Sequence, residues 1–548
     1  MKYFEFPCGC RFPQVETEDG TTRIKFDANI ENIPLDCKRT WNLISDGNTK
    51  GVFQLESHLG RHTAKQLQPQ SIEHLSALVA IIRPGCRDSI QDGKSITDHY
   101  IDRKNGKEPV EYLHPILKKS LSPTYGELIY QEQSMRIAQD VAGFDLQQAD
   151  ILRKAIGKKK PEIMAQCKDA FLAGAKEQAV VTEEEAAEIF SWIEKSQRYS
   201  FNKSHSVSYA INAYLSAYVK AHFPRVFFTS YLYYAKEKQK PQDEVNELVN
   251  NAKLMDIDVY PPDVRHLNDH FRLIEKKIYF GLSDIKGIGA SVIQRLGTHI
   301  DLCVKNLKKP IGEWTWLEFL IHLSQNVTST AIKALISSGA LPFFKMTRTQ
   351  MLFEYEVYSS LSKREQAWVQ QREFKSIQHM LEVMIETPSG KMGACATKRR
   401  VEKISGILAS VKNPAYNMDD TPIWIASIEE ALLGIPLTCT VVDSCSMDAA
   451  NCTCRDFIKG SRGKQDVILI GCKVDRTHEH ETKRGKTPGQ KMGFVSVSDN
   501  TGLLESVVVF PKEWASYKNL LTEDNTVMLQ GKREAGKESF IIQKVFQI

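Results

Sequence analysis

Two groups of basic residues between residues 145 and 223 have the types and spacing needed to bind phosphate. The first group is the run Arg153, Lys154, Lys158, Lys159 and Lys160. The second group, Lys203 and His205, follows Asn202 at the start of a predicted helix. A helix N-terminus carries unpaired N–H groups and partial positive charge, which favour phosphate, and asparagine commonly caps it. The alternative is a solvated basic joint and an ordinary capped helix, which charge alone favours.

The helices that would position these groups are predicted from hydrophobic spacing. The first has an apolar repeat at Leu146, Ala149, Leu152 and Ile156. Gly157 predicts its end and Pro161 predicts the first position of the next helix, so the three consecutive lysines would form the joint. The helix after Asn202 has a predicted apolar face made of Val207, Ile211, Tyr214, Leu215 and Tyr218.

Composition describes an ordinary globular chain of several domains. The 548 residues are 42% hydrophobic and 25% charged, with a net charge of +5. This mild excess of basic residues does not identify a nucleic-acid-binding protein, so the local clusters must carry that argument. We find no apolar run of transmembrane length and no signal-peptide pattern at the N-terminus, and we expect a soluble cytoplasmic protein without a membrane partner.

The twelve cysteines do not predict a disulfide framework in a chain of this length. Cys8 and Cys10 form a C-x-C pair, with Cys37 downstream, and we predict free thiols at an edge turn because a metal site would need a fourth ligand. A second cluster consists of Cys439, Cys445, Cys452 and Cys454. The spacing of these four cysteines is not that of a standard zinc ribbon. A thiol-rich loop is therefore the favoured interpretation, and zinc binding by this cluster is the alternative. No metal site is predicted.

A glycine turn further along the chain has the character of a DNA-backbone contact. Gly287 and Gly289 follow Lys286 and precede a predicted helix that begins at Ala290. This resembles the turn of a helix–hairpin–helix, in which glycines let backbone N–H groups approach a phosphate. Residues 331–339 would end the second helix of the module.

The last eighty residues read as an all-β domain. Five short strands with one helical insert at residues 511–521 suit an OB-fold barrel. Basic residues beside an aromatic side chain are typical of single-strand binding. The candidates are Lys483, Arg484, Lys486, Lys491 and Phe494. The alternative is a barrel used only for packing, with a charged loop.

Six segments together resemble one known family. They are GVFQLES, IIRPG, YIDRKNGKEP, YGELIYQEQ, LRKAIGKKKPE and FNKSHSVSYA, in that order. The chain resembles the fingers and following regions of the bacterial DNA polymerase III alpha subunit, a C-family replicative polymerase, with phage-encoded or split versions as the nearest kind of relative. The resemblance implies a multidomain α+β fold: mainly α-helical fingers and helix–hairpin–helix, then a C-terminal all-β OB-fold barrel.

The expected domains follow from the same resemblance. They are an N-terminal segment (1–32), the fingers (33–275), the helix–hairpin–helix module (276–345), a helical linker and lead-in region (346–464) and the OB-fold (465–548).

The resemblance also implies roles for individual residues. The residues expected to bind the phosphates of an incoming deoxynucleoside triphosphate are Arg153, Lys154, Lys158, Lys203, His205 and, more weakly, Arg83 of the RPG turn. Tyr130, Gln131 and Glu132 would position the template base or support the pocket. Lys154 departs from the family, which often has arginine there, and lysine cannot reproduce the bidentate fork of arginine.

Polymerase chemistry requires carboxylates that hold two Mg²⁺ ions, and the family carries them on a palm that precedes the fingers. Only 32 residues precede the first fingers motif, and Asp27 is a weak catalytic candidate. We therefore expect the C-terminal portion of a replicative polymerase, which binds dNTP and primer–template DNA while a separate palm-bearing chain holds Mg²⁺. The alternative is a non-catalytic DNA-binding protein derived from a polymerase. A sliding clamp is a further expected partner, although Gln350–Phe353 lacks the clamp-peptide spacing.

Overall fold

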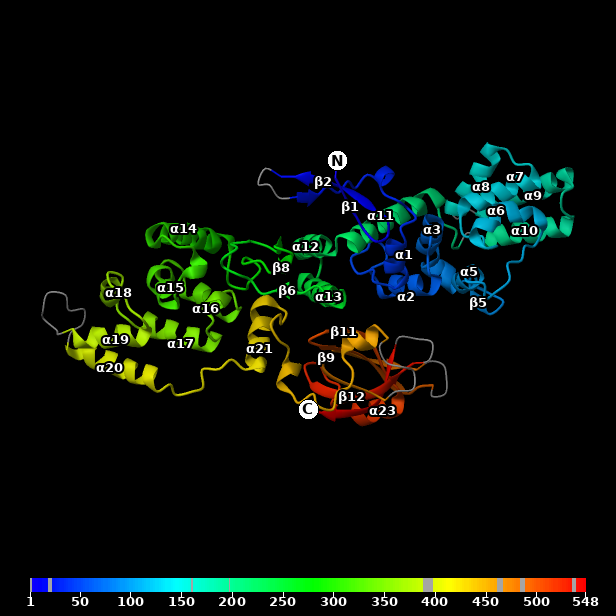
Figure 1. The fold of residues 1–548 in the computed structure, drawn as a ribbon. Coiled ribbons are helices and arrows are strands. Elements are labelled where there is room, and N and C mark those ends of the chain that lie inside the picture. Colours follow the sequence, from blue (N-terminus) through cyan, green and yellow to red (C-terminus); the bar gives the residue numbers. More distant parts are fainter. Residues whose placement is uncertain are drawn as a thin grey trace. The chain divides into compact units, whose positions relative to one another are not determined.

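The computed structural model describes residues 2–17, 22–158, 161–196, 198–387, 398–460, 467–482, 488–534 and 539–548. The chain divides into two compact units, Met1–Phe227 (unit 1) and Phe228–Ile548 (unit 2), and each is described by itself (Figure 1).

Unit 1 is mainly helical. Its helices are α1 (Lys38–Ser45), α2 (His58–Leu67), α3 (Ile72–Ile81), α4 (Pro84–Asp88), α5 (Ile96–Lys104), α6 (Lys118–Leu121), α7 (Gln131–Ala142), α8 (Leu146–Lys158), α9 (Pro161–Gln178), α10 (Glu183–Ser196) and α11 (Lys203–His222), with 3-10 turns η1 (Ile30–Asn32), η2 (Pro115–Leu117) and η3 (Ser122–Thr124). Its strands are β1 (Tyr3–Glu5), β2 (Arg11–Glu16), β3 (Thr22–Ile24), β4 (Ile90–Gln91) and β5 (Lys94–Ser95). The strands β1, β2 and β3 form one antiparallel sheet in chain order.

One core of unit 1 lies among α7, α8, α9 and α10. Ala149, Leu152 and Ile156 of α8 are buried there, as their helical spacing predicted. Leu146 departs from the prediction: it is the first residue of the helix and is 73% exposed. Gly157 does not end the helix, which continues to Lys158, because a helix tolerates one glycine near its end at a cost of about 1 kcal/mol.

The long helix α11 packs along α3, which is buried from Leu75 to Ile81. Its buried face contains Tyr214 and Tyr218, as predicted, together with several alanines and the polar residues Ser206, Lys220 and His222. Val207, Ile211 and Leu215 are only partly buried. Ser206 Oγ of α11 donates to Ser76 O of α3 at 2.6 Å, a contact through a small side chain that a search for large apolar residues overlooks.

Unit 2 combines helices with a barrel. Its helices are α13 (Pro241–Leu254), α14 (Ala290–Leu307), α15 (Trp316–His322), α16 (Ser329–Ser337), α17 (Arg348–Ser359), α18 (Lys363–Val369), α19 (Ile377–Glu386), α20 (Lys398–Lys412), α21 (Pro422–Leu433), α22 (Cys454–Ile458) and α23 (Pro511–Tyr517), while α12 (Pro224–Tyr234) runs from unit 1 into unit 2. The 3-10 turns are η4 (Ala235–Glu237), η5 (Ile311–Glu313), η6 (Ser324–Asn326), η7 (Pro342–Phe344) and η8 (Val441–Ser444). Three short strands, β6 (Val259–Tyr260), β7 (Arg272–Ile274) and β8 (Lys277–Tyr279), pair in the order β6-β8-β7.

The C-terminal part is a closed five-strand barrel, as the OB-fold prediction required. Its strands are β9 (Ile468–Glu481), β10 (Lys491–Asp499), β11 (Gly502–Val509), β12 (Thr526–Arg533) and β13 (Phe540–Gln547), closed in the order β10-β11-β13-β12-β9. The one parallel pair joins β11 to β13, and α23 is the predicted helical insert between β11 and β12. The expected class, a multidomain α+β fold ending in an OB-like barrel, is confirmed.

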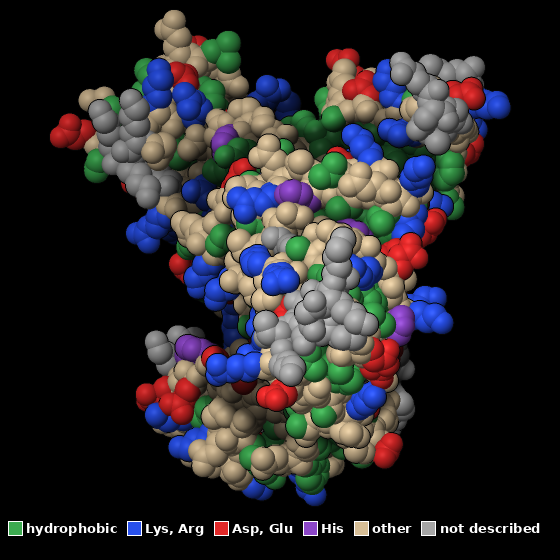
Figure 2. All heavy atoms as spheres, turned by 90° about the vertical axis from the view of Figure 1, so that its left-hand side faces the viewer, with side chains coloured by type: hydrophobic (Ala, Val, Ile, Leu, Met, Phe, Trp, Pro, Cys, Tyr) green, Lys and Arg blue, Asp and Glu red, His purple; other side chains and the backbone are tan. Residues whose placement is uncertain are grey.

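Charged side chains of both signs lie on the face of the molecule drawn in Figure 2. On the face drawn in Figure 2, Lys and Arg side chains lie scattered among Asp and Glu side chains. In the described part of the chain, no helix is long and apolar enough to cross a membrane. Any phosphate-binding function must therefore be argued from local groups of residues.

Candidate functional site

The start of α11 is held by side chains from two segments. The Asn202 side chain caps the helix, with His205 N–H donating to its Oδ1 at 2.9 Å. Glu132 accepts from the Asn202 amide and from the Lys203 backbone N–H, both at 2.9 Å. Two N–H groups of this helix end are thus already bonded, while the side chains of Lys203 and His205 are exposed. The side chains are therefore the main groups that this helix end offers to a phosphate.

Tyr130 and Phe201 form the base on which these basic residues lie. A parallel bridge joins the two residues, with Phe201 N–H donating to Ile129 O at 2.9 Å. Tyr130 is buried, its hydroxyl lies 2.9 Å from Ser76 Oγ, and burial raises its pKa to about 12. Tyr130 therefore stays neutral and supports the site from beneath.

Three candidate phosphate ligands gather around this aromatic pair. The Arg83 guanidinium carbon lies 4.4 Å from the centre of the Phe201 ring, and Lys203 Nζ lies 5.8 Å from that of Tyr130. The His205 ring lies 5.5 Å from Phe201. The structure thus brings Arg83 together with the pair at the head of α11, more than a hundred residues later in the sequence.

The RPG turn is fixed by a close backbone contact. A Cβ added to Gly85 would lie 2.9 Å from Arg198 O and 3.0 Å from Tyr199 Cβ, so only glycine fits without movement. Pro84 begins α4, where a missing N–H costs nothing. Together these features hold Arg83 beside the segment that leads into α11.

Arg153 and Lys154 share an acidic partner, Asp150, which is not among the predicted site residues. Arg153 Nη2 lies 2.8 Å from Asp150 Oδ1, and Lys154 Nζ lies 2.7 Å from Asp150 Oδ2. Hydrogen bonds from Lys154 and Arg153 lower the pKa of Asp150. The spacing of three and four residues on a helix is a signal that could have predicted these pairs. Both cations remain partly exposed, at 33% and 56% of their side chains.

The end of α8 lies against the start of α7. A Cβ added to Gly157 would lie 3.5 Å from Gln131 Nε2, and Gln131 is the neighbour of Glu132, which binds Asn202 and Lys203. The backbone of Lys158 ends α8 at this point. The side chain of the predicted ligand Lys158 lies outside the described part of the chain, as do Lys159 and Lys160 of the same basic run. The basic end of α8 and the head of α11 therefore approach each other through α7.

The glycine turn before α14 is open to solvent on the side of its glycines. Gly287 has φ +92°, which favours glycine, whereas Gly289 has φ −101° and a Cβ added there would meet nothing within 4 Å. Ile285 and Ile288 are buried, and Lys286 N–H donates to Leu432 O at 2.9 Å. The turn is thus anchored from below while its exposed backbone can approach a phosphate.

The barrel presents part of the predicted single-strand surface. Phe494 is 43% exposed, and the His480 ring lies 6.2 Å from it. Lys491 Nζ pairs with Glu479 Oε1 at 2.6 Å. The other predicted residues, Lys483, Arg484 and Lys486, lie outside the described residues. An exposed ring with an adjacent histidine and a weakly held lysine offers a stacking surface for a base.

Asp27 has a local structural role. It is exposed and accepts from Asn29 N–H and from the Asn32 side-chain amide, both at 2.9 Å, and these hydrogen bonds lower its pKa. In the part of the chain that the structure describes, one group of Cys, His, Asp or Glu ligand atoms is close enough to hold a metal ion, and Asp27 is not a member.

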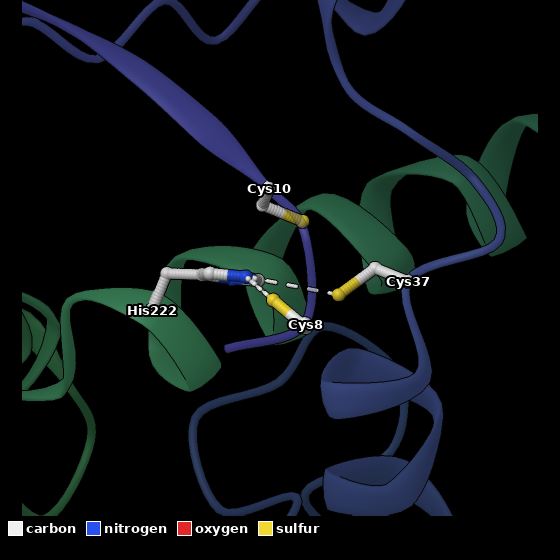
Figure 3. Close-up of side chains that lie close together, drawn as sticks. All are labelled: Cys8, Cys10, Cys37 and His222. Carbon is white, nitrogen blue, oxygen red and sulfur yellow. Dashed lines mark hydrogen bonds between the residues drawn. The ribbon is translucent and has the colours of Figure 1, made fainter. Parts of the chain in front are cut away.

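That group consists of Cys8, Cys10, Cys37 and His222 (Figure 3). Its ligand atoms all lie within 4.8 Å of one another. The three cysteines are visible as a group in the sequence, but the fourth ligand is not, because His222 lies 185 residues after Cys37 and no local spacing links them.

The C-terminal cysteines are dispersed among different surroundings. Cys452 and Cys454 belong to the barrel core, whereas Cys439 Sγ donates to Pro422 O at 3.4 Å. Burial raises the pKa of the Cys454 thiol well above its ordinary value. Packing and local hydrogen bonds thus account for these three thiols.

Two regions match known protein families. Residues 14–179 match the family model described as the bacterial DNA polymerase III alpha subunit finger domain, and residues 256–351 match a helix-hairpin-helix motif. The first match includes Arg83, Arg153 and Lys154, and the second includes the glycine turn at Gly287 and Gly289.

Similarity to curated relatives extends along nearly the whole chain. The DNA polymerase III subunits alpha of Aquifex aeolicus and Thermus aquaticus are each 32% identical over 528 residues, which cover 95% and 93% of this chain. The corresponding subunit of Pseudomonas aeruginosa is 30% identical over 92% of this chain. The chain spans 40%, 38% and 41% of these relatives, so about two-fifths of their length. The predicted relationship to DNA polymerase III alpha subunits is therefore confirmed for the finger and helix–hairpin–helix regions.

Proposed function

We propose, from this relationship, that the chain contributes the nucleotide- and DNA-binding modules of a replicative DNA polymerase in the bacterial cytoplasm. Its fingers would bind the incoming dNTP, and its glycine turn and barrel would bind primer–template DNA. The observation that carries the proposal is the gathering of Arg83, Lys203 and His205 around the Phe201 and Tyr130 rings.

The basic residues suit a triphosphate because they are exposed and only weakly engaged. Exposed ion pairs are worth about 0–1 kcal/mol, so a phosphate can displace Asp150 from Arg153 and Lys154 at little cost. Arginine offers two parallel N–H donors to a phosphate, whereas lysine contributes a point charge. Cations fixed in position before the reaction stabilise the negative charge that a phosphoryl transfer develops.

In this proposal, the Mg²⁺ ions of the polymerase reaction are bound by another polypeptide. Mg²⁺ prefers carboxylate, carbonyl and water oxygens, whereas the one metal-capable group among the described residues offers sulfur and nitrogen. We place the Mg²⁺-binding carboxylates on a palm-bearing polypeptide outside these 548 residues, supplied as a separate chain. The residues of this chain would bind and orient the triphosphate for it.

The template would be held at two further places in unit 2. Backbone N–H groups at Gly287 and Gly289 suit a duplex phosphate, because no side chain stands in the way. Phe494 suits stacking on an unpaired template base. We assign no clamp-binding residue among the described residues, since the candidate segment Gln350–Phe353 lies within α17 and Met351 is buried.

The test is dNTP binding by the full chain, followed by primer extension with a palm-bearing polymerase chain. Lys203→Ala and Arg153→Ala should each weaken dNTP binding about tenfold or more, because a hydrogen bond to a charged group is worth about 1.5–3 kcal/mol. The matched control is Lys176→Ala, since Lys176 is an exposed, ion-paired lysine at the end of α9 and should change nothing.

The outcomes separate two functions. Weakened dNTP binding with unchanged DNA binding supports the polymerase proposal. If both variants bind dNTP as the wild type does, or the wild type binds DNA but no dNTP, the chain is instead a non-catalytic DNA-binding protein derived from a polymerase.

A further inference from the structure

We propose that Cys8, Cys10, Cys37 and His222 bind one zinc ion, which ties the N-terminal hairpin and the start of α1 to the end of α11. The four ligands come from three segments that are far apart in the sequence (Figure 3). Cys8 and Cys10 lie in the turn between β1 and β2, Cys37 is the N-cap of α1, and His222 is the last residue of α11.

The distances fit the edges of a tetrahedral site. Zinc–sulfur bonds of about 2.3 Å and zinc–nitrogen bonds of about 2.0–2.1 Å put a cysteine sulfur and a histidine nitrogen about 3.6 Å apart. Cys8 Sγ lies 3.3 Å from His222 Nε2, and Cys37 Sγ lies 3.7 Å from the same nitrogen. All four ligand atoms lie within 4.8 Å of one another, so small side-chain rotations would bring them onto one ion.

His222 is oriented for metal binding. Its Nδ1 lies 2.9 Å from Tyr218 O, and a carbonyl can only accept, so Nδ1 carries the proton. The lone pair of Nε2 therefore points toward the cysteines. A backbone carbonyl that accepts from the second ring nitrogen is the usual way in which a zinc-binding histidine is held.

The turn of the hairpin places two sulfurs on the same side. Gly9 has φ +86°, Gly9 N–H donates to Phe6 O at 2.8 Å, and Phe6 N–H donates to Cys10 O at 2.9 Å. These bonds close a tight turn with one cysteine on either side of the glycine. The φ of Gly9 disfavours any other residue, so the turn is built around the C-x-C spacing.

The burial of the four ligands and the aromatic rings around them are typical of a closed, structural metal site. Cys10, Cys37 and His222 are 5%, 4% and 4% exposed, and Cys8 is partly buried. Aromatic rings enclose the group: Phe6 lies 5.0 Å from the His222 ring, Tyr218 lies 4.1 Å from it, and Phe12 lies 5.8 Å from it. Four protein ligands leave no open position for substrate, and three thiolates with one imidazole select zinc over magnesium or calcium.

The direct test is metal content and cobalt spectroscopy of the untagged full chain. We expect one zinc per chain, and we expect cobalt in its place to show the visible absorption of a tetrahedral ion with thiolate ligands. Cys37→Ser and His222→Ala should reduce zinc to a small fraction of one per chain. The matched control is Cys86→Ser, because Cys86 is also a buried cysteine of unit 1 but lies outside the group. It should keep its zinc.

A second measurement avoids dependence on variants that fail to fold. Removing zinc from the wild-type chain with a chelator should reduce hydrogen-exchange protection in β1, β2 and α1, and added zinc should restore it. Purified chain without zinc that also takes up none would overturn the proposal. Zinc retained at full occupancy in both Cys37→Ser and His222→Ala would overturn it as well.

Discussion

Replacing Arg348 with methionine should destabilise the helices of unit 2 that surround the helix–hairpin–helix module by about 3–5 kcal/mol. Arg348 begins α17 and is 8% exposed, and its Nη2 lies 2.6 Å from Glu429 Oε1 of α21. Its Nη1 donates to Ser337 O at the end of α16 at 2.8 Å. One side chain thus links the consecutive helices α16 and α17 to α21, whose Glu429 lies 81 residues after Arg348.

The expected loss of stability follows from the groups that remain buried after each substitution. Glu429 is fully buried and also accepts from the backbone N–H groups of Leu437 and Thr438, at 2.6 and 2.8 Å. Without Arg348 its carboxylate would be a buried charge with no cation, which accounts for the expected 3–5 kcal/mol. Glu429→Gln in the same background removes that charge, so the double variant should be more stable than Arg348→Met alone, with a coupling energy of about 2 kcal/mol.

The assay is a double-mutant cycle by hydrogen exchange of the full chain, read in peptides from α16, α17 and α21. The matched control is Lys333→Met, which breaks an exposed 2.9 Å pair with Glu356 and should cost less than about 0.5 kcal/mol. Additive effects of Arg348→Met and Glu429→Gln, or a loss no larger than that of the control, would refute the reasoning.

Three further predictions concern the barrel and the glycine turn. Burial raises the pKa of Asp475 to about 6, so the protonated carboxyl group favours the folded state. This contribution to the free energy of unfolding is fully present below about pH 4 and is lost as the pH rises through 6. Asp475→Asn should remove this pH dependence and raise the free energy of unfolding at pH 8 by about 1–3 kcal/mol, as measured by urea unfolding at several pH values. A variant with the pH profile of the wild type would contradict this prediction. Gly289→Ala should leave the melting temperature unchanged but weaken primer–template binding in fluorescence anisotropy, whereas Gly287→Ala should also cost about 1 kcal/mol of stability because its φ is positive. Phe494→Ala should weaken binding of a single-stranded oligonucleotide by about 1–3 kcal/mol while Phe494→Trp retains it, and equal affinities of the two would argue against base stacking.

Local sequence patterns, such as the alternation of apolar residues along a strand, predicted the fold well. The five strands after residue 466 and the insert at residues 511–521 correspond to β9 through β13 and α23, because alternating apolar residues of a half-buried strand are visible in sequence. The helix start at Pro161 was also correct, since proline suits a first helical position.

Features that depend on tertiary contacts were harder to predict. The buried alanines and the serine of α11 carry little hydrophobic signal, although they belong to the buried face of the helix. His222 joins Cys37 only because α11 packs beside α1, and the contact between Arg83 and Phe201 likewise needs the folded chain. Asp150 is different: its pairs with Arg153 and Lys154 follow from helical spacing and were predictable.

The helix α11 acts as a rigid spacer between two groups of residues. It has 20 residues, so its ends lie about 30 Å apart, with His222 at one end and Lys203 at the other. Lys220, buried near the His222 end, donates to Lys50 O at 2.7 Å and forms a second fixed point close to the first. Its other end is fixed as well, by Glu132 at Asn202 and Lys203 and by Ser206 Oγ, which donates to Ser76 O at 2.6 Å. One continuous helix, anchored at both ends, therefore joins the cysteine–histidine group to the candidate phosphate ligands Lys203 and His205.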